Sequence, residues 1–161
     1  MTQIDVRMVD YRNAAQAAAL VDLLDGYARD PAGGGTPLDA AVLQGLPEAL
    51  AARPQAFSVV AYEGEQPVGL INCIEGFSTF ACKPLVNVHD VVVLASHRGQ
   101  RVAQKMFALV EQEARNRGAC KLTLEVLSGN APALRSYERE GFAGYQLDPA
   151  FGHALFLHKK L

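Results

Sequence analysis

The 161-residue sequence has little net charge, no long apolar run and only three cysteines. Its 15 lysines and arginines against 17 acidic residues give a net charge of −2, which offers no general attraction for nucleic acid or an anionic membrane. No segment reaches the roughly 18 apolar residues of a membrane span, and the N-terminal residues lack the basic start and apolar run of a signal peptide. We therefore expect a cytoplasmic protein that binds neither nucleic acid nor membranes.

The cysteines and histidines do not suggest a metal site. The cysteines are odd in number, widely spaced and without a CxxC pair, which favours unpaired thiols in a reducing compartment. His97, His153 and His158 lack ligand-like spacing, so we expect them at the rim or the surface. A G-x-G-x-x-G motif after a strand is also missing, which argues against a dinucleotide-dependent oxidoreductase. The three cysteines are Cys73, Cys82 and Cys120.

Length and residue pattern predict the elements of the fold. The chain is long enough for one domain with a substantial core, so we expect a single domain over residues 1–161. Alternating and β-rich apolar runs predict strands over 4–9, 56–63, 67–77, 85–94, 120–126, 142–146 and 153–159. Apolar periodicity and cap residues predict helices over 13–28, from Thr36 and Pro37 to before Pro54, over 100–117 and over 130–140.

The order of these elements indicates an α/β (α+β) fold. The strand–helix–strand unit across residues 86–126 should form a right-handed parallel crossover, whereas the runs at 56–63 and 67–77 should form an antiparallel hairpin. We therefore expect a mixed, mostly antiparallel sheet of about six to seven strands, flanked by about four helices.

The start of the helix at 100–117 carries charge of an unexpected sign. The stretch SHRGQRVAQKM places Arg98, Arg101 and Lys105 near its first turns, although a helix N-terminus bears about half a positive charge and favours acidic residues. A tight turn that opens into a helix presents backbone N–H groups to an anion, and bound phosphate would reverse the cost of the cations. Gly99 would let the backbone approach such a ligand closely. A solvated turn with basic side chains in water is the alternative on this stretch alone.

A second motif downstream joins this loop to a known pattern. VHDVVVLASHRGQRVAQKM followed by LEVLSGNAPALRSYEREGF resembles the acetyl-CoA signature of the GNAT superfamily of N-acyltransferases. The loop R/Q-x-x-G-x-G/A falls on residues 98–103, and N-x-x-A-x-x-x-Y-x-x-x-G-F is filled at every position from Asn130 to Phe142. Arg101 departs from the pattern, because this position is usually glycine. The resemblance is strongest over residues 86–142 and implies a GNAT fold with a parallel strand pair at the cofactor cleft.

The resemblance implies acetyl-CoA as the cofactor and direct attack of an amine on its thioester, without a metal. Backbone groups around Val91 and Val93 would pair with the pantetheine arm and polarise the acetyl carbonyl. Asn130 matches a position that contacts the cofactor arm, although an asparagine before a helix is equally often a plain cap. The implied cofactor-binding residues are Val91, Val93, Arg98, Gly99, Gln100, Arg101, Val102, Ala103, Gln104 and Asn130.

Three residues are candidates for catalysis. Tyr137 matches the position that often protonates the departing CoA thiolate, with core packing as the ordinary alternative. His89 and Asp90 precede the segment expected to hold the acetyl group, and strict alternation places them on opposite faces of the strand. Histidine has an unperturbed pKa of about 6.5, which suits a general base, whereas Asp90 suits a cationic amine. A histidine and an aspartate at a sheet rim without chemistry are the alternative.

The sequence therefore predicts an N-acetyltransferase acting on a primary amine of a small molecule, or on an amino-acid or peptide amine. The strand also looks like the acidic strand of polyamine acetyltransferases, but His89 replaces one acid, which weakens a specifically polyamine assignment. A non-catalytic acyl-CoA-binding sensor on the same fold is the alternative, with Arg101 as the trace of lost turnover. The resemblance and the apolar stretch HALFLHKKL at 153–161 also suggest a homodimer.

Overall fold

The computed structural model describes residues 3–145 and 147–161 of the chain, so Met1, Thr2 and Gln146 are outside the description. The chain divides into two compact units, Met1–Glu125 and Val126–Leu161, and each is described by itself. The single domain expected over residues 1–161 stays a prediction.

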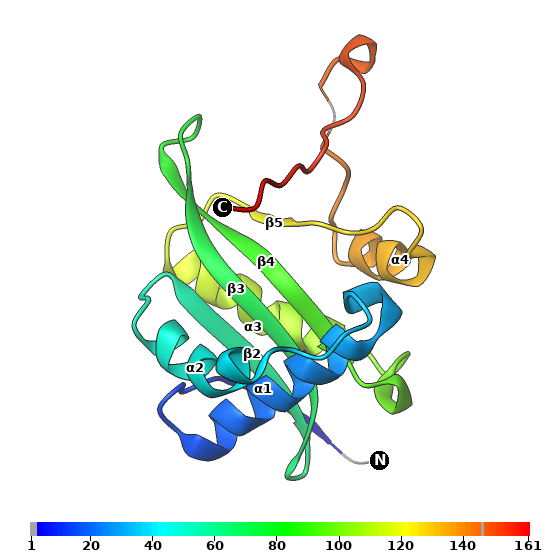
Figure 1. The fold of residues 1–161 in the computed structure, drawn as a ribbon. Coiled ribbons are helices and arrows are strands. Elements are labelled where there is room, and N and C mark those ends of the chain that lie inside the picture. The colour runs from blue at the N-terminus through cyan, green and yellow to red at the C-terminus, as the bar shows by residue number, and fades with distance from the viewer. Residues whose placement is uncertain (1–2, 146) are drawn as a thin grey trace. The chain divides into compact units, whose positions relative to one another are not determined.

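The first unit is built on a sheet of five strands in the order β1-β2-β3-β4-β5 (Figure 1). Its strands are β1 (Ile4–Met8), β2 (Ala56–Glu63), β3 (Gln66–Ser78), β4 (Lys83–Val93) and β5 (Leu122–Leu124). The first four pair antiparallel and β5 pairs parallel with β4, which confirms a mixed sheet with a parallel crossover. The described residues contain fewer strands than the sequence predicted.

Helices cover both faces of this sheet. The helices α1 (Ala14–Arg29) and α2 (Ala40–Ala51) lie on one face, and α3 (Val102–Asn116) lies on the other (Figure 1). On the first face, Leu20 and Leu23 of α1 pack in a cluster with apolar residues of β2, β3 and β4. On the second face, Met106 and Phe107 of α3 are completely buried. Burial of an aliphatic or aromatic side chain contributes about 1.5–3 kcal/mol, so both helices are held mainly by these stripes.

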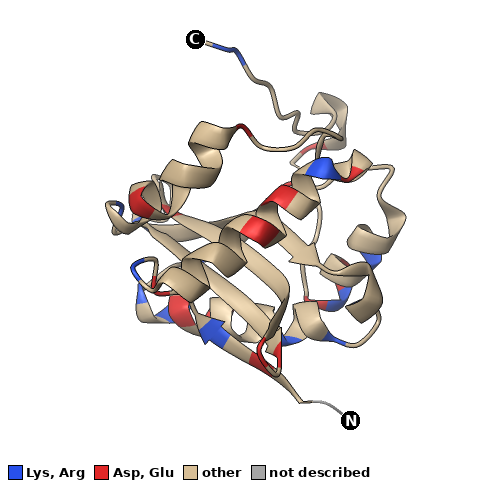
Figure 2. Cartoon of the chain, turned by 60° about the horizontal axis from the view of Figure 1, so that its bottom comes forward, with Lys and Arg blue, Asp and Glu red and all other residues tan. Residues whose placement is uncertain are grey.

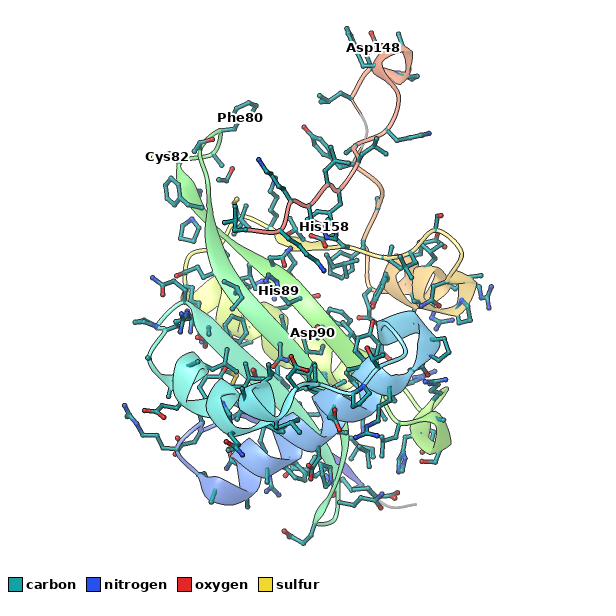
Figure 3. The ribbon with its side chains drawn as sticks, viewed as in Figure 1. Phe80, Cys82, His89, Asp90, Asp148 and His158 are labelled. Carbon is teal, nitrogen blue, oxygen red and sulfur yellow. The ribbon has the colours of Figure 1, made fainter. Side chains whose placement is uncertain are left out.

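Two tight turns connect the central strands. Gly64 adopts a φ of 61° in the turn between β2 and β3, which confirms the predicted hairpin. The β3–β4 hairpin turns at residues 79–82, where Phe80 is fully exposed and Cys82 has a φ of 52°. Figure 3 shows Phe80 and Cys82 at the tip of this hairpin, well away from His89 and Asp90 on β4.

Two helices begin later than predicted, because the backbone before each of them has a hydrogen bond or a conformation that is not helical. The predicted start of α2 at Thr36 and Pro37 is wrong, since the N–H group of Leu38 donates to the Asp25 carboxylate at 2.8 Å and α2 begins at Ala40. The predicted start of α3 at residue 100 is early by about one half-turn, because Arg101 has a left-handed conformation that no helical residue adopts.

The second unit contains α4 (Ala131–Arg139), which begins and ends as predicted within one residue. The side chain of Asn130 accepts from the N–H group of Ala133 at 3.3 Å, and Gly141 ends the helix with a φ of 90°. The predicted strands at 142–146 and 153–159 are wrong over the described part of both segments, and Gln146 is outside the description. A strand needs a hydrogen-bonding partner, and none of the described residues of this unit supplies one.

Charges of both signs are mixed along the elements (Figure 2). The blue and red residues share the same helices and loops, in agreement with the small net charge of −2. Over residues 3–145 and 147–161, no helix has both the length and the apolar character that crossing a membrane requires.

Candidate active site

The turn before α3 leaves the first backbone N–H groups of that helix uncapped. Gly99 has a φ of 75° with open space at its Cβ position, and Arg101 follows with φ 61° and ψ 23°. Arg101 is the cap residue, but its side chain forms no capping hydrogen bond. The first backbone bond of α3 runs from the N–H group of Lys105 to the carbonyl of Arg101 at 3.1 Å, so the N–H groups of residues 102–104 precede the helical ladder. This geometry suits an anion.

The side chains of this loop divide into exposed and buried ones. Arg98 Nε donates to the carbonyl of Val93 at 3.3 Å, and Gln100 Nε2 donates to the carbonyl of Ser96 at 3.0 Å. Arg98, like Arg101, is exposed to solvent, so its charge remains accessible to an approaching anion. Val102 is buried in the core, so only its backbone is available to a ligand.

The strand before the loop has one edge that β5 does not cover. The register of β4 with β5 ends at the pair of Val88 with Leu124, whereas β3 pairs with β4 as far as Val93. Within the described part of the first unit, the stretch from His89 to Val93 is therefore paired on one side only. Backbone groups of Val91, on this stretch, can hydrogen-bond an extended ligand as a neighbouring strand would.

A β-bulge changes the facing of the two candidate residues on β4. The register pairs Asn72 with Asp90 and Cys73 with Val88, so His89 is an extra residue. Bulges break the strict alternation of side chains along a strand. The imidazole Nδ1 of His89 is hydrogen-bonded to the side-chain oxygen of Asn87, which lies on the same face as Asp90. His89 and Asp90 therefore lie on the face covered by α1, and the prediction of opposite faces is wrong (Figure 3).

Asp90 is half-buried and belongs to a polar group within an apolar face. The amide Nδ2 of Asn72 donates to Asp90 Oδ2 at 3.1 Å, and Asn72 Oδ1 accepts from the Ser58 hydroxyl at 2.6 Å. Burial, followed by the charge of Asp90, raises the pKa of Tyr27 on α1, so its hydroxyl stays protonated near neutral pH. Among the described residues, no basic side chain forms an ion pair with Asp90.

Sequence reasoning missed three residues of this group. They are Ser58, Asn72 and Tyr27. Ser58 and Asn72 were visible as single polar residues inside the apolar runs FSVVAY and GLINCI, because a polar side chain on a buried strand requires a hydrogen-bonding partner. Tyr27 gave no such signal, since an aromatic residue on an amphipathic helix is ordinary.

Comparison with known proteins identifies the family. The Acetyltransferase (GNAT) family profile matches residues 20–142, which include β4, the loop before α3 and α4. The chain belongs to the GNAT acetyltransferase family. The matched region covers most of the chain and contains both motifs on which the resemblance rested, so the predicted family is confirmed.

Individual relatives agree with this assignment. The chain is 36% identical to the streptothricin acetyltransferase of Streptomyces lavendulae over 86 residues, which are 52% of this chain and 46% of that enzyme. The chain thus spans about half the length of this curated relative. A soil-metagenome aminoglycoside acetyltransferase in complex with sisomicin has a TM-score of 0.76 and 15% identity, covering 97% of both chains. AAC(6')-Iy in complex with a bisubstrate analogue of CoA has a TM-score of 0.73 and 16% identity over 99% of both chains, so the GNAT fold is confirmed.

The other GNAT motif lies in the second unit, which is described by itself. Asn130 caps α4, so its predicted alternative as a helix cap is confirmed, and its contact with a cofactor stays a prediction. Tyr137 is half-buried on α4, and its ring meets that of Phe142 edge to face with centroids 6.0 Å apart. The N–H group of Phe142 also donates to the carbonyl of Tyr137 at 3.0 Å, so the end of α4 fixes the position of the tyrosine backbone.

The side chains of His97 and Cys73 are both buried in the first unit. His97 was predicted at the rim or surface, but only 7% of it is exposed, because Nε2 meets the Glu63 carboxylate at 3.1 Å and Nδ1 meets the hydroxyl of Ser96. Burial raises the pKa of Cys73 to about 12, so its thiol is protonated at neutral pH and is no nucleophile.

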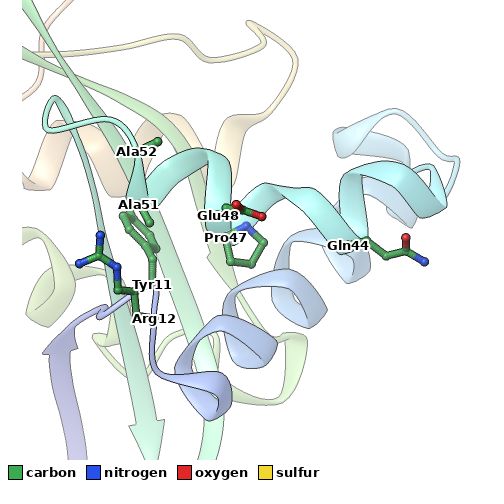
Figure 4. A pocket seen from close by; sticks show the side chains of 7 residues that line it. All are labelled: Tyr11, Arg12, Gln44, Pro47, Glu48, Ala51 and Ala52. Atoms are coloured by element: carbon green, nitrogen blue, oxygen red, sulfur yellow. The ribbon is translucent and has the colours of Figure 1, made fainter.

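A pocket lies apart from these residues, between α2 and the connection from β1 to α1 (Figure 4). Its volume is about 580 Å³. Tyr11 lines it and also reaches the interior, where its hydroxyl is hydrogen-bonded to Ser58 at 2.8 Å. The lining residues are Tyr11, Arg12, Gln44, Pro47, Glu48, Ala51 and Ala52. The predicted site residues are not among them.

The left-handed backbone of Arg101 predicts a stabilising substitution. Arg101→Gly should raise the free energy of unfolding by about 0.5–1 kcal/mol, because a left-handed conformation costs a non-glycine residue roughly 1–2 kcal/mol and glycine gives back part of this in the unfolded chain. Urea denaturation measures the change. Gln100→Gly is the matched control and should lower stability, since Gln100 has no positive φ. Equal losses in both variants would contradict the strain at Arg101.

Proposed function

We propose that the protein transfers an acetyl group from acetyl-CoA to a primary amine of a small cationic molecule. The observation that carries the proposal is the uncapped start of α3 beside the uncovered edge of β4. The uncapped start of α3 suits an anion, and the uncovered edge of β4 suits an extended chain that carries amides. These two features lie on consecutive segments of the protein. Acetyl-CoA combines a pyrophosphate with such a chain.

Named residues would hold this cofactor. The N–H groups of residues 99–104, with the exposed charges of Arg98 and Arg101, would bind the pyrophosphate. The open space at Gly99 permits close approach of a phosphate. Backbone groups of Val91 and Val93 would pair with the pantetheine arm, and the Asn130 side chain would contact that arm from α4.

The chemistry needs two proton transfers. Acetyl-CoA supplies a thioester whose carbonyl carbon is attacked by the amine nitrogen, so a C–N bond forms and the C–S bond breaks. His89 or Asp90 takes a proton from the amine, and Tyr137 gives one to the departing sulfur. The N–H groups on β4 stabilise negative charge on the carbonyl oxygen.

The charge of Asp90 favours a cationic acceptor. This carboxylate is half-buried and has no basic partner among the described residues, so an ammonium group would compensate it. The chain is similar to acetyltransferases named for streptothricin and for aminoglycosides, which supports a small-molecule acceptor here. A cytoplasmic location and a homodimer remain predictions.

A non-catalytic acyl-CoA sensor is the second candidate, favoured by Arg101 at the loop position where the family usually has glycine. The backbone of Arg101 has a positive φ, so the loop has the conformation that a glycine at this position would adopt without strain. A sensor would bind acetyl-CoA without releasing CoA in the presence of any amine, so turnover separates the two candidates.

Acetyl-CoA should protect the protein against thermal unfolding. A ligand that binds only the folded state stabilises it by mass action, and raised salt should weaken this protection because charges contribute. Free adenosine should protect much less, since it lacks phosphates. Differential scanning fluorimetry with acetyl-CoA at millimolar concentration measures the effect.

Charge reversal provides the control for this experiment. Arg98→Glu should lose most of the protection, whereas Arg115→Glu, in the last turn of α3, should keep it. An unchanged melting temperature of the wild-type protein in acetyl-CoA would rule out the loop as its site.

A further inference from the structure

A chain of hydrogen bonds crosses the strands beneath α1 and ends at Asp90. The Tyr11 hydroxyl lies 2.8 Å from Ser58 Oγ, Ser58 Oγ lies 2.6 Å from Asn72 Oδ1, and Asn72 Nδ2 lies 3.1 Å from Asp90 Oδ2. Only 1% of Ser58 and 7% of Asn72 are exposed. Four polar side chains are thus linked from the β1–α1 connection, through β2 and β3, to β4.

The chemistry of the groups fixes the direction of every bond. An ionised carboxylate only accepts, so Asn72 turns its NH₂ group toward Asp90 and its carbonyl oxygen toward Ser58. That carbonyl only accepts as well, so the Ser58 hydroxyl donates to it. Because Ser58 has a single proton, the Tyr11 hydroxyl must donate to Ser58 Oγ. Burial raises the pKa of Tyr11, which keeps this donor protonated.

This direction explains why polar residues occupy an otherwise apolar face. A free amide side chain can turn over and present its oxygen to the carboxylate, which would repel it. The Ser58 hydroxyl adds to the cost of that alternative, because the reversed amide would take away the carbonyl oxygen that accepts the Ser58 proton. Asp90 on one side and Ser58 on the other therefore favour the same orientation of Asn72.

We propose that Asn72, oriented by Ser58, is a positioning residue that holds the Asp90 carboxylate toward the substrate ammonium group. The inference rests on the proposed function, since it assigns Asp90 to the amine. One carboxylate oxygen is taken by Asn72, and Oδ1 forms no hydrogen bond within the described residues, so it is the oxygen offered to the substrate. The four linked side chains all belong to the first unit and lie on the face of the sheet that α1 covers.

Substitutions along this chain of hydrogen bonds test the positioning role through the KM for the amine. Ser58→Ala removes the donor that orients Asn72, and Asn72→Leu removes the donor to Asp90 at similar volume. Each should raise KM for the amine by about tenfold, because the Asp90 carboxylate is then no longer held toward the substrate. KM for acetyl-CoA should stay within about twofold, since the loop before α3 is untouched. The probe is whichever of sisomicin, streptothricin or spermidine the wild-type protein acetylates best.

Two matched variants separate positioning from stability. Ser58→Thr keeps the hydroxyl and should restore the amine KM, even where the added methyl group lowers the melting temperature. Tyr11→Phe leaves the bond from Ser58 to Asn72 and should change the amine KM much less than Ser58→Ala.

The outcomes distinguish this inference from the proposed function. A raised amine KM in Ser58→Ala and Asn72→Leu, with rescue by Ser58→Thr, supports the positioning role. Folded, active variants with an unchanged amine KM overturn it and leave the acetyl transfer standing. Equal rises in KM for both substrates also overturn it, because they indicate a general structural defect. If the wild-type protein acetylates no amine, the proposed function itself fails, and the positioning role fails with it.

Discussion

Replacing Tyr137 by phenylalanine is expected to reduce kcat by about 10²–10⁴-fold while acetyl-CoA binding stays near normal. The departing sulfur is a thiolate of an ordinary thiol with a pKa of about 8.5, and a phenol with a pKa of about 10 is a suitably matched proton donor. The substitution deletes only the hydroxyl, so the loss falls on the step in which the C–S bond breaks.

The substitution keeps the ring packing at the end of α4. The Tyr137 ring meets Phe142 edge to face at 6.0 Å, and a phenylalanine ring reproduces this contact. The end of α4 at Gly141 is formed by backbone bonds that do not involve the hydroxyl. We therefore expect a circular dichroism spectrum and a melting temperature close to those of the wild-type protein.

Steady-state kinetics over pH 6–9 and isothermal titration with acetyl-CoA measure the two parts of this prediction. Phe142→Leu is the control, because it disturbs the same packing without touching the hydroxyl, and it should cost stability more than kcat. Normal turnover by Tyr137→Phe across this pH range would assign the tyrosine to packing and would require another donor for the thiolate.

Asp90→Asn should lower kcat/KM for a cationic amine by about 10²–10³-fold, because truncating one partner of a buried charge pair costs roughly 2–5 kcal/mol. The carboxylate is half-buried and no basic side chain among the described residues compensates it, so in the proposed function the substrate ammonium group would be the missing cation. An asparagine has the same shape and can keep the bond from Asn72 by turning its carbonyl oxygen toward Asn72 Nδ2, so the substitution removes mainly the charge.

Kinetics with one cationic and one neutral amine test this assignment, and the loss should be much larger for the cationic amine. Asp5→Asn is the matched control: this aspartate also lies on a strand, but it is exposed and paired with Arg7, so its removal should leave both amines unaffected. Equal losses for the two amines would assign Asp90 to proton transfer instead, and no loss would remove it from the site.

The sequence predicted most of the first unit because its signals are local. The β-rich run of β2, the apolar stripe of α3 and the cap at Asn13 each depend on residues close together in the chain, and each is present in the structure. The predicted start of α2 was wrong because a residue outside this local stretch decides it. Thr36 and Pro37 form a good local start, but the Asp25 carboxylate, far away in sequence, binds the N–H group of Leu38.

The facing of His89 and Asp90 could not be predicted in the same way. Alternation assumes that every residue of β4 faces one residue of β3, and the bulge at His89 violates this through the pairing of Asn72 with Asp90. Such a register is chosen by both strands together and by what packs on them. The left-handed conformation of Arg101 was equally hard to predict from local sequence. An arginine side chain does not favour that conformation, and only the loop motif indicates it.

Acetyl transfer to a cationic amine is the central claim, and one assay tests it directly. Purified protein is mixed with acetyl-CoA and each of a panel of amines that includes sisomicin, streptothricin and spermidine. Thiol release is followed with a disulfide reagent, and the products are weighed by mass spectrometry. The account predicts CoA release that depends on the amine, together with a product heavier by one acetyl group. Binding of acetyl-CoA without CoA release for any amine in the panel would contradict it and would favour the sensor.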